Sequence, residues 1–425
     1  MATTQNAPAP GQLFDVPGVG GGSTQWFDEY EDTLTLAFTP SASSQKPVLG
    51  IAKMRQTDVV LEWSAEIKVK QSVTAGTGQT VKGSQYAPWN SVGPLKVLIQ
   101  NQYSSIDVES GIDAYIFAMC RPYRRTSMRT ILGANPAGSP AGGSATGYPS
   151  LTNAQANLDW PRQWKYTEAD TFTLVYPLGP GVWFDSYWDL AIGGTPSGMP
   201  PHSAFVSPQY MAGTTRVITA AITANQVLSS ATTAIAPVHT TAKTTSGDTA
   251  TTTANSWKVS LRRHGVYAGN PVVNPVVYSW QHRRKTDRFG TIAGSSRATI
   301  ELPLDSGQIM SSYLRLYDPA ATTTVGAAIA ITKVTNVEFQ YGSGLLRFKG
   351  TPAELQRRWL AQHGTLLPPG VLAIDFATNE RGQVTNHRLP NTLTTGGILW
   401  KLTFTGAQSS KAYAVLGTES LVYVT

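Results

Sequence analysis

The 425-residue chain is poor in charge and in cysteine. Charged residues make up 14% of it, against about 25% in an average soluble domain. Its single cysteine, Cys120, excludes a disulfide framework and a zinc site built from cysteines. No apolar run reaches the roughly 18 residues of a transmembrane helix. No Asn-X-Ser/Thr acceptor occurs, and the N-terminus lacks the charged and apolar regions of a signal peptide. We therefore expect a protein made in a reducing cytosol.

Catalytic motifs are also missing. The sequence contains no phosphate-binding loop, no HExxH and no GxSxG, and its six histidines share no metal-ligand spacing. Asp185 and Asp189 lie four residues apart in an aromatic segment, and we interpret them as the solvated acids of a short amphipathic helix. A glycosidase-like carboxylate pair beside sugar-stacking rings is the alternative. Cys120 lies in an apolar run and is expected to be an inert core residue. We therefore predict no catalytic, cofactor-binding or metal-binding residues.

The residues that are present favour a large β-rich protein. Hydrophobic residues make up 41%, with 11 Trp, 17 Tyr and 12 Phe, which is too apolar for disorder and sufficient for a large core. The 39 glycines and 27 prolines are typical of many turns. At about 150 residues per domain, the length favours two large β domains.

The net charge is +7 and the isoelectric point about 9.3. Basic residues cluster twice, at 121–129 and at 282–288. We expect solvated loops or ion pairs between subunits at both clusters, and contact with an anionic partner is the alternative. The members are Arg121, Arg124, Arg125 and Arg129 in the first cluster, and His282, Arg283, Arg284, Lys285 and Arg288 in the second.

The first half reads as a series of strands after a Gly/Pro-rich arm at 1–23. Alternation is clearest at 58–70, where Val59, Leu61 and Trp63 share one face, which predicts a strand with one buried face. Long loops are expected at 133–149 and 229–256, because neither segment has much to bury, and a strand-and-loop excursion on the surface is the alternative for 229–256. A short helix is possible within 183–191. The other predicted strands are 32–39, 95–103, 113–121, 170–177, 214–224 and 257–263.

Two Asn-Pro dipeptides within 269–277 break regular structure, so we place a domain boundary there. A helix is predicted at 352–363, because Thr351 and Glu354 form a capping box around Pro352 at the first helical position. Leu355 and Trp359 share its apolar face. The predicted strands of this half are 276–281, 297–304, 311–318, 334–341, 370–377 and 398–405, with a closing run within 412–425.

This pattern predicts an all-β chain of two tandem eight-stranded jelly rolls with short helical insertions. No strand–helix–strand alternation favours a parallel sheet, and helices between late strands favour jelly rolls over immunoglobulin-like domains. The expected organisation is a flexible arm at 1–23, a first jelly roll at 24–268 and a second at 269–425.

The order of features resembles the double jelly-roll major capsid proteins of tectiviruses, the membrane-containing icosahedral phages. The resemblance rests on several segments spread over most of 24–425, and none of them is a catalytic signature. These are Val92-Gly93-Pro94 before a strand, Val175-Tyr176-Pro177-Leu178, the Tyr-Leu-Arg-Leu-Tyr-Asp run at 313–318, the basic helix segment 355–359, Pro369-Gly370-Val371 and the closing Leu421-Val422-Tyr423.

The resemblance implies a structural major capsid protein, which is not an enzyme and needs no cofactor. It implies homotrimers that tile an icosahedral shell, contact neighbouring capsomers and vertex proteins, and face an internal membrane or viral DNA. The virion capsid is the expected location, after assembly in the host cytoplasm. Two alternatives remain at this point. One is a carbohydrate-binding or carbohydrate-active β-sandwich protein, using the aromatic segments 160–166 and 183–188, and the other is a phage spike or attachment protein.

Overall fold

In the computed structural model, the described part of the chain consists mainly of β-strands and contains two α-helices. Side-chain surroundings are described mainly for 93–96, 106–117, 120 and the second half from 283 onward. The described residues are 24–37, 46–53, 58–74, 81–83, 92–99, 103–120, 170–177, 217–224, 228–229, 238–240, 251–268, 280–303, 308–318, 327–363, 367–368, 370–378, 389–390 and 397–423.

Eight strands of the first half form two antiparallel sheets. Numbered by their order along the chain, these eight strands lie in the orders 1-8-3-6 and 2-7-4-5. The first sheet is β1 (Thr24–Ala37), β11 (Thr251–Ala268), β3 (Asp58–Thr74) and β7 (Asp170–Pro177). The second is β2 (Lys46–Lys53), β8 (Val217–Ala224), β5 (Val92–Ile99) and β6 (Tyr103–Val108).

The second half repeats this topology strand for strand, with the same orders 1-8-3-6 and 2-7-4-5. One sheet contains β12 (Trp280–Phe289), β21 (Tyr413–Tyr423), β14 (Gln308–Asp318) and β18 (Val371–Asp375). The other contains β13 (Arg297–Glu301), β20 (Ile398–Phe404), β16 (Val334–Tyr341) and β17 (Leu345–Gly350). Two sheets of four strands in this order make a jelly roll. The predicted fold class, two tandem eight-stranded jelly rolls, is confirmed.

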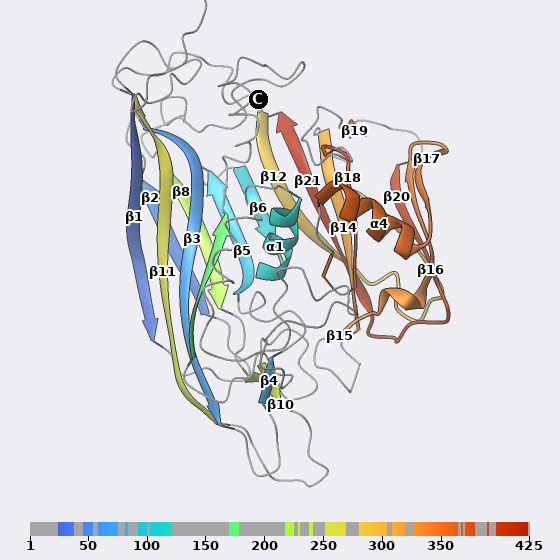
Figure 1. Ribbon diagram of the computed structural model, residues 1–425, viewed down its shortest axis with the longest axis horizontal. Helices are drawn as coiled ribbons and strands as arrows, with labels where there is room; N and C mark the ends of the chain where they lie inside the picture. Colours follow the sequence, from blue (N-terminus) through green and yellow to red (C-terminus); the bar gives the residue numbers. More distant parts are fainter. Residues whose placement is uncertain are drawn as a thin grey trace, which may run out of the picture.

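Short elements complete the described part. β4 (Val81–Gly83), β9 (Leu228–Ser229) and β10 (Val238–Thr240) form a small sheet of their own. β15 (Ala327–Ala328) and β19 (Leu389–Pro390) add to β14, and the 3-10 turn η5 (Ile331–Lys333) precedes β16. In Figure 1 the strands of the first half lie on one side of the molecule and those of the second half on the other.

The core of the second jelly roll lies between its two sheets. On β20, Trp400 and every second residue on either side of it are buried, because alternate side chains of a strand point to the same face. Leu314 and Leu316 come from the opposite sheet, and the indole Nε1 of Trp400 donates to Ser312 Oγ at 2.9 Å. β14 is buried on both faces from Ile309 to Tyr317. The second face of β14 is therefore covered by a part of the chain outside this core.

The helix predicted at 352–363 is present as α4 (Pro352–His363). Its capping box is formed, since the Thr351 backbone N–H donates to Glu354 Oε2 at 2.7 Å and the Glu354 N–H donates to Thr351 Oγ1 at 3.3 Å. Leu355 and Trp359 are each 1% exposed, as their shared apolar face predicts. In both halves a helix follows the fifth strand, which places α4 and the first helix at equivalent points of the repeat.

The prediction of a strand at 113–121 is wrong, because this segment forms helix α1 (Gly111–Met119). Ser110 begins the helix, with its backbone carbonyl accepting from Asp113 N–H at 2.9 Å. The described residues of α1 are buried all round, so the periodicity that separates helix from strand is absent. Cys120, just after α1, is 1% exposed, and its Sγ contacts the Ile116 carbonyl at 3.6 Å, as expected for an inert core thiol.

Of the two alternatives for 229–256, a loop or a strand-and-loop excursion, the described residues fit the second. Residues 238–240 form β10, and β11 already begins at Thr251. Threonine is β-branched and suits a strand, so a Thr-rich segment low in charge was not sufficient ground for a loop. The end of the strand predicted at 276–281 belongs to β12, which continues to Phe289, and 276–279 lie outside the described residues. The arm at 1–23, the loop at 133–149 and the possible helix within 183–191 lie outside the described residues.

Candidate functional site: the junction between the two jelly rolls

A single sheet runs through both halves of the molecule. Strand β6, at the edge of the first jelly roll, pairs in parallel with β12, the first strand of the second, through Ile106 opposite Arg284 and Asp107 opposite Lys285. The sheet therefore continues in the order β14-β21-β12-β6-β5-β8-β2. Backbone pairing across this boundary holds the two jelly rolls edge to edge (Figure 1).

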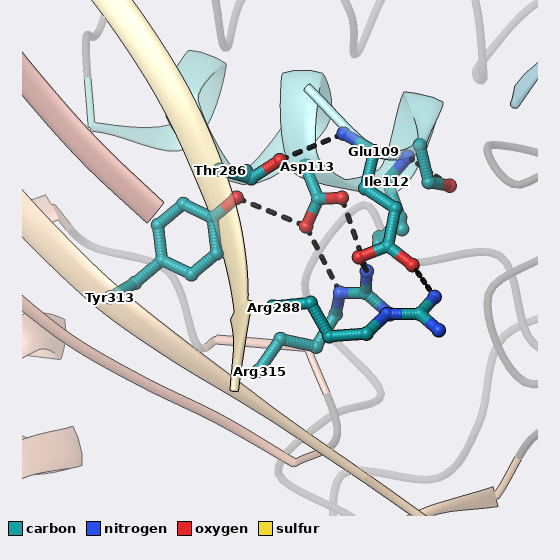
Figure 2. A network of polar contacts seen from close by, with 8 residues as sticks. Glu109, Ile112, Asp113, Thr286, Arg288, Tyr313 and Arg315 are labelled. Atoms are coloured by element: carbon teal, nitrogen blue, oxygen red, sulfur yellow. Dashed lines mark hydrogen bonds and ion pairs between the residues drawn. The ribbon is translucent and has the colours of Figure 1, made fainter. Parts of the chain in front are cut away.

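Helix α1 adds a buried ion pair to this junction (Figure 2). Asp113, in the first turn of α1, accepts two hydrogen bonds from Arg315 of β14, from Nε at 3.0 Å and from Nη2 at 3.1 Å. The Tyr313 hydroxyl donates to the same carboxylate at 3.0 Å. Asp113 is fully buried and Arg315 is 4% exposed. The second face of β14 is thus occupied by α1, and two residues 202 positions apart form one bidentate contact.

A second, more exposed contact lies beside the first. Arg288 of β12 pairs with Glu109, which directly precedes α1, and its guanidinium lies 4.1 Å from the ring centroid of Tyr413. The Glu109 backbone N–H donates to Thr286 Oγ1 at 2.8 Å. Arg315 also reaches Glu109, with Nη2 at 3.9 Å from Oε2. Figure 2 shows these side chains converging from β12, β14 and the start of α1. Both acids come from the first half and both arginines from the second.

Burial governs the electrostatics of the junction. It raises the pKa of Asp113 above its ordinary value, although Arg315 and the Tyr313 hydroxyl act in the opposite direction. Burial also raises the pKa of Tyr313 well above 10.0, and the neighbouring Asp113 carboxylate adds to that rise. Tyr313 therefore stays a hydrogen-bond donor at any physiological pH. A charged pair out of water holds only while its geometry is kept, which makes this contact sensitive to a shift of one half against the other.

Buried polar groups continue beyond the junction. Arg284 of β12 stands opposite Glu419 of β21 in the register, at 1% and 0% exposure, and Ser311 donates to Glu419 Oε2 at 2.9 Å. Under α4, His363 Nε2 lies 3.2 Å from Asp375 Oδ2, both fully buried. Polar groups buried in this way require defined partners, so they fix the relative positions of β12, β14, β21 and α4.

The basic cluster at 282–288 is not a loop, because it lies along β12 in the middle of the continuous sheet. Its described members serve contacts within the chain. Arg284 is buried, Lys285 pairs with Asp287 at 2.7 Å, and Arg288 pairs with Glu109. The cluster at 121–129 lies outside the described residues, as do Asp185, Asp189 and the aromatic segments 160–166 and 183–188.

The junction residues were not predicted from the sequence, although one signal for them is present there. Arg315 stands alone between Leu314 and Leu316, and Asp113 stands alone in an apolar run. A charged residue within a buried segment requires a partner, so each of these positions predicts one. What the sequence does not contain is the pairing of Asp113 with Arg315, since nothing local connects them.

Chemically, the arrangement holds the two jelly rolls together through backbone pairing and a buried ion pair. Within the described part of the chain, no group of three His, Cys, Asp or Glu side chains is placed to hold a metal ion. Among the helices described there, none has the length and apolar character needed to cross a membrane.

Neither a protein-family model nor a curated protein sequence matches this chain. Solved structures do match its fold. The atomic structure of Sulfolobus Turreted Icosahedral Virus contains a chain 13% identical, with a TM-score of 0.53, covering 94% of this chain and 91% of that one. The Faustovirus major capsid protein is 10% identical, with a TM-score of 0.53 and coverage of 95% and 91%. The PBCV-1 virus capsid is 10% identical, with a TM-score of 0.51 and coverage of 94% of both chains.

These likenesses span almost the whole chain, at identities too low to show more than a common fold. They cover both of the repeated halves. The chain thus has the double jelly-roll fold, in which a continuous sheet and a buried Asp–Arg pair unite both jelly rolls.

Proposed function

We propose that this protein is the major capsid protein of an icosahedral virus or phage, with a structural role and no catalytic one. The observation that carries the proposal is the union of two equivalent jelly rolls into one block by β6–β12 pairing and the Asp113–Arg315 pair. A shell subunit must keep its shape while neighbours press against it, and this junction provides that rigidity. The fold is also similar to that of viral capsid proteins.

We further propose that three chains form the capsomer. Each chain supplies two equivalent jelly rolls, so three chains supply six similar units around one axis, which suits a hexagonal lattice. Homo-oligomers with closed cyclic symmetry are the common case for such blocks. The partners are copies of this chain, neighbouring capsomers and other virion proteins at the vertices, with a membrane or DNA beneath. The chain bounds 1–23, 24–268 and 269–425 remain the proposed arm and domains, and the arm is proposed to bind a neighbouring subunit.

The test is the mass and shape of the purified full-length protein. Light scattering after size exclusion should give about three times 45.5 kDa, and negative-stain micrographs should show particles with a roughly hexagonal outline. Deleting 1–23 should leave this trimer intact and lower the yield of closed shells. A protein that stays at 45.5 kDa at every concentration would contradict the proposal.

A further inference from the structure

The repeat of the two jelly rolls leaves two equivalent edges unused. Within the first half, the fifth strand, β6, is an edge that pairs with the first strand of the next jelly roll, β12. The fifth strand of the second half is β17, and among the described residues it pairs only with β16. The first strand of the first half is β1, and in the described part it pairs only with β11. Figure 1 shows β1 and β17 at opposite ends of the molecule, so one chain cannot join them.

The β17 edge exposes apolar side chains of the kind that another chain usually covers. Among side chains with described burial, the exposed large apolar ones are Leu345 at 63%, Leu346 at 49% and Leu360 at 41%, and all three belong to β17 or α4. A free edge strand that carries apolar side chains invites pairing with another chain. Leu345 and Leu346 are neighbours on β17, and exposed hydrophobic residues that lie together mark an interaction surface more often than residues scattered singly.

The same edge is basic. β17 carries Arg347 and Lys349, and α4 carries Arg357 and Arg358, with Glu354 as the one acid of these two elements. Lys349 pairs with Glu338 at 3.2 Å, whereas Arg347 and Arg357 are exposed on the surface. We name the exposed residues Leu345, Leu346, Arg347, Lys349, Arg357 and Leu360 the β17–α4 edge.

Strand β1 has the complementary charge. Its sequence contains four acids and no basic residue, with the acids at Asp28, Glu29, Glu31 and Asp32. In the register with β11, Glu29 stands opposite Arg263, whereas Glu31 and Asp32 stand opposite Leu261 and Ser260. The register positions directly opposite these last two acids therefore hold uncharged residues.

We propose that the β17–α4 edge of one copy of this chain binds strand β1 of the next copy, repeating between chains the junction that β6 and β12 form within one. The inference rests on the proposed trimer and specifies its interface. By the repeat, β1 lies beside β17 in parallel, as β12 lies beside β6. Because the two surfaces differ and lie at opposite ends, the contact is head-to-tail, and three such contacts close a ring.

The charge is reversed between the two junctions. Inside the chain, the fifth strand and its helix supply acids, Glu109 and Asp113, and the partner sheet supplies Arg288 and Arg315. Between chains, the fifth strand and its helix are basic and the partner strand is acidic. Opposite charge steers the two proposed surfaces together, and like charge would oppose contact of acidic β1 with the acidic α1 side. The reversal thus distinguishes the contact between chains from the contact within one.

Charge reversal on the full-length chain tests this interface. One variant carries Arg347→Glu and Arg357→Glu, and a second carries Glu31→Lys and Asp32→Lys, neighbouring positions that cover both faces of β1. A third variant combines all four changes. A control with Lys333→Glu and Lys411→Glu makes the first variant's charge change at exposed sites away from this edge. Light scattering over a concentration series measures dissociation of each trimer, and circular dichroism checks folding.

Each of the first two variants should dissociate at a protein concentration at least about tenfold higher than wild type, since like charges then face each other. The combined variant should recover most of the loss, and the control should match wild type. If wild type is a trimer and both charge variants dissociate as it does, or if the combined variant is weaker than either, the interface is wrong and the capsid proposal stands. A monomeric wild type overturns both.

Discussion

The Asp113–Arg315 pair allows a sharp prediction about the junction. Arg315→Met removes the guanidinium, keeps most of the side-chain volume and leaves the Asp113 carboxylate buried with Tyr313 as its remaining donor of those described. Breaking a buried ion pair by removing one partner costs about 3–5 kcal/mol. The whole stability of a typical domain is about 5–15 kcal/mol, so the midpoint of urea unfolding should fall markedly.

The double variant supplies the decisive comparison. Asp113→Asn with Arg315→Met removes both charges together, so no buried charge is left uncompensated and most of the loss should be recovered. Tryptophan fluorescence and circular dichroism, at fixed protein concentration, give the four unfolding midpoints of a double-mutant cycle. If the two single losses simply add in the double variant, the pair is not coupled and the junction argument fails.

The stability loss in the single variant Arg315→Met should depend on pH. Burial raises the pKa of Asp113, and removing Arg315 takes away a contribution that lowers it. A carboxyl whose folded pKa lies above its unfolded value of 3.8 stabilises the fold when protonated, and this contribution is lost as pH rises through the folded pKa. Arg315→Met should therefore be less damaging in mild acid than at neutral pH. A loss that grows as the pH falls towards 5 would contradict burial as the cause.

Three further predictions concern the second jelly roll. Trp359→Ala should cost about 3–5 kcal/mol in the unfolding free energy, because a ring at 1% exposure leaves a cavity, and alanine at a solvent-facing position of α4 is the control. Gly417→Ala should lower the melting temperature, since the new methyl would overlap the Tyr313 ring, and an unchanged melt would show that this ring can move. Hydrogen bonds from Thr351 lower the pKa of Glu354, so its stabilising effect should be present above about pH 4.5 and lost below, and Glu354→Gln should abolish that pH dependence in thermal melts.

Several elements were predictable from local pattern alone. The alternation of Val59, Leu61 and Trp63 predicted β3, and the Thr351–Glu354 capping box predicted the start of α4. Both signals extend over only a few residues. One marks the buried face of a strand and the other marks the first turn of a helix. The strand prediction for the segment that forms α1, 111–119, was wrong. A segment buried on every side shows no hydrophobic periodicity, so its pattern does not separate helix from strand.

Local sequence patterns could not predict the junction, because its contacts join residues that are far apart in the chain. An arginine between two leucines, as at Arg315, predicts a buried cation that requires an acidic partner. That partner, Asp113, is 202 residues away in the chain and comes close only because β6 pairs with β12. The loop predicted for the basic cluster at 282–288 failed in the same way, because Arg284 looks like a surface charge until the sheet buries it.

The sequence by itself determined the class of protein, two successive all-β units with short helices and no catalytic motif, because apolar alternation and turn chemistry are local properties. Tertiary structure alone decided that the two units share a sheet, that Asp113 pairs with Arg315, and that β17 and β1 are edge strands among the described residues. The physical reason is that ion pairing and strand pairing depend on distance in space. The topology sets that distance, and residues far apart in the chain carry no mark of it.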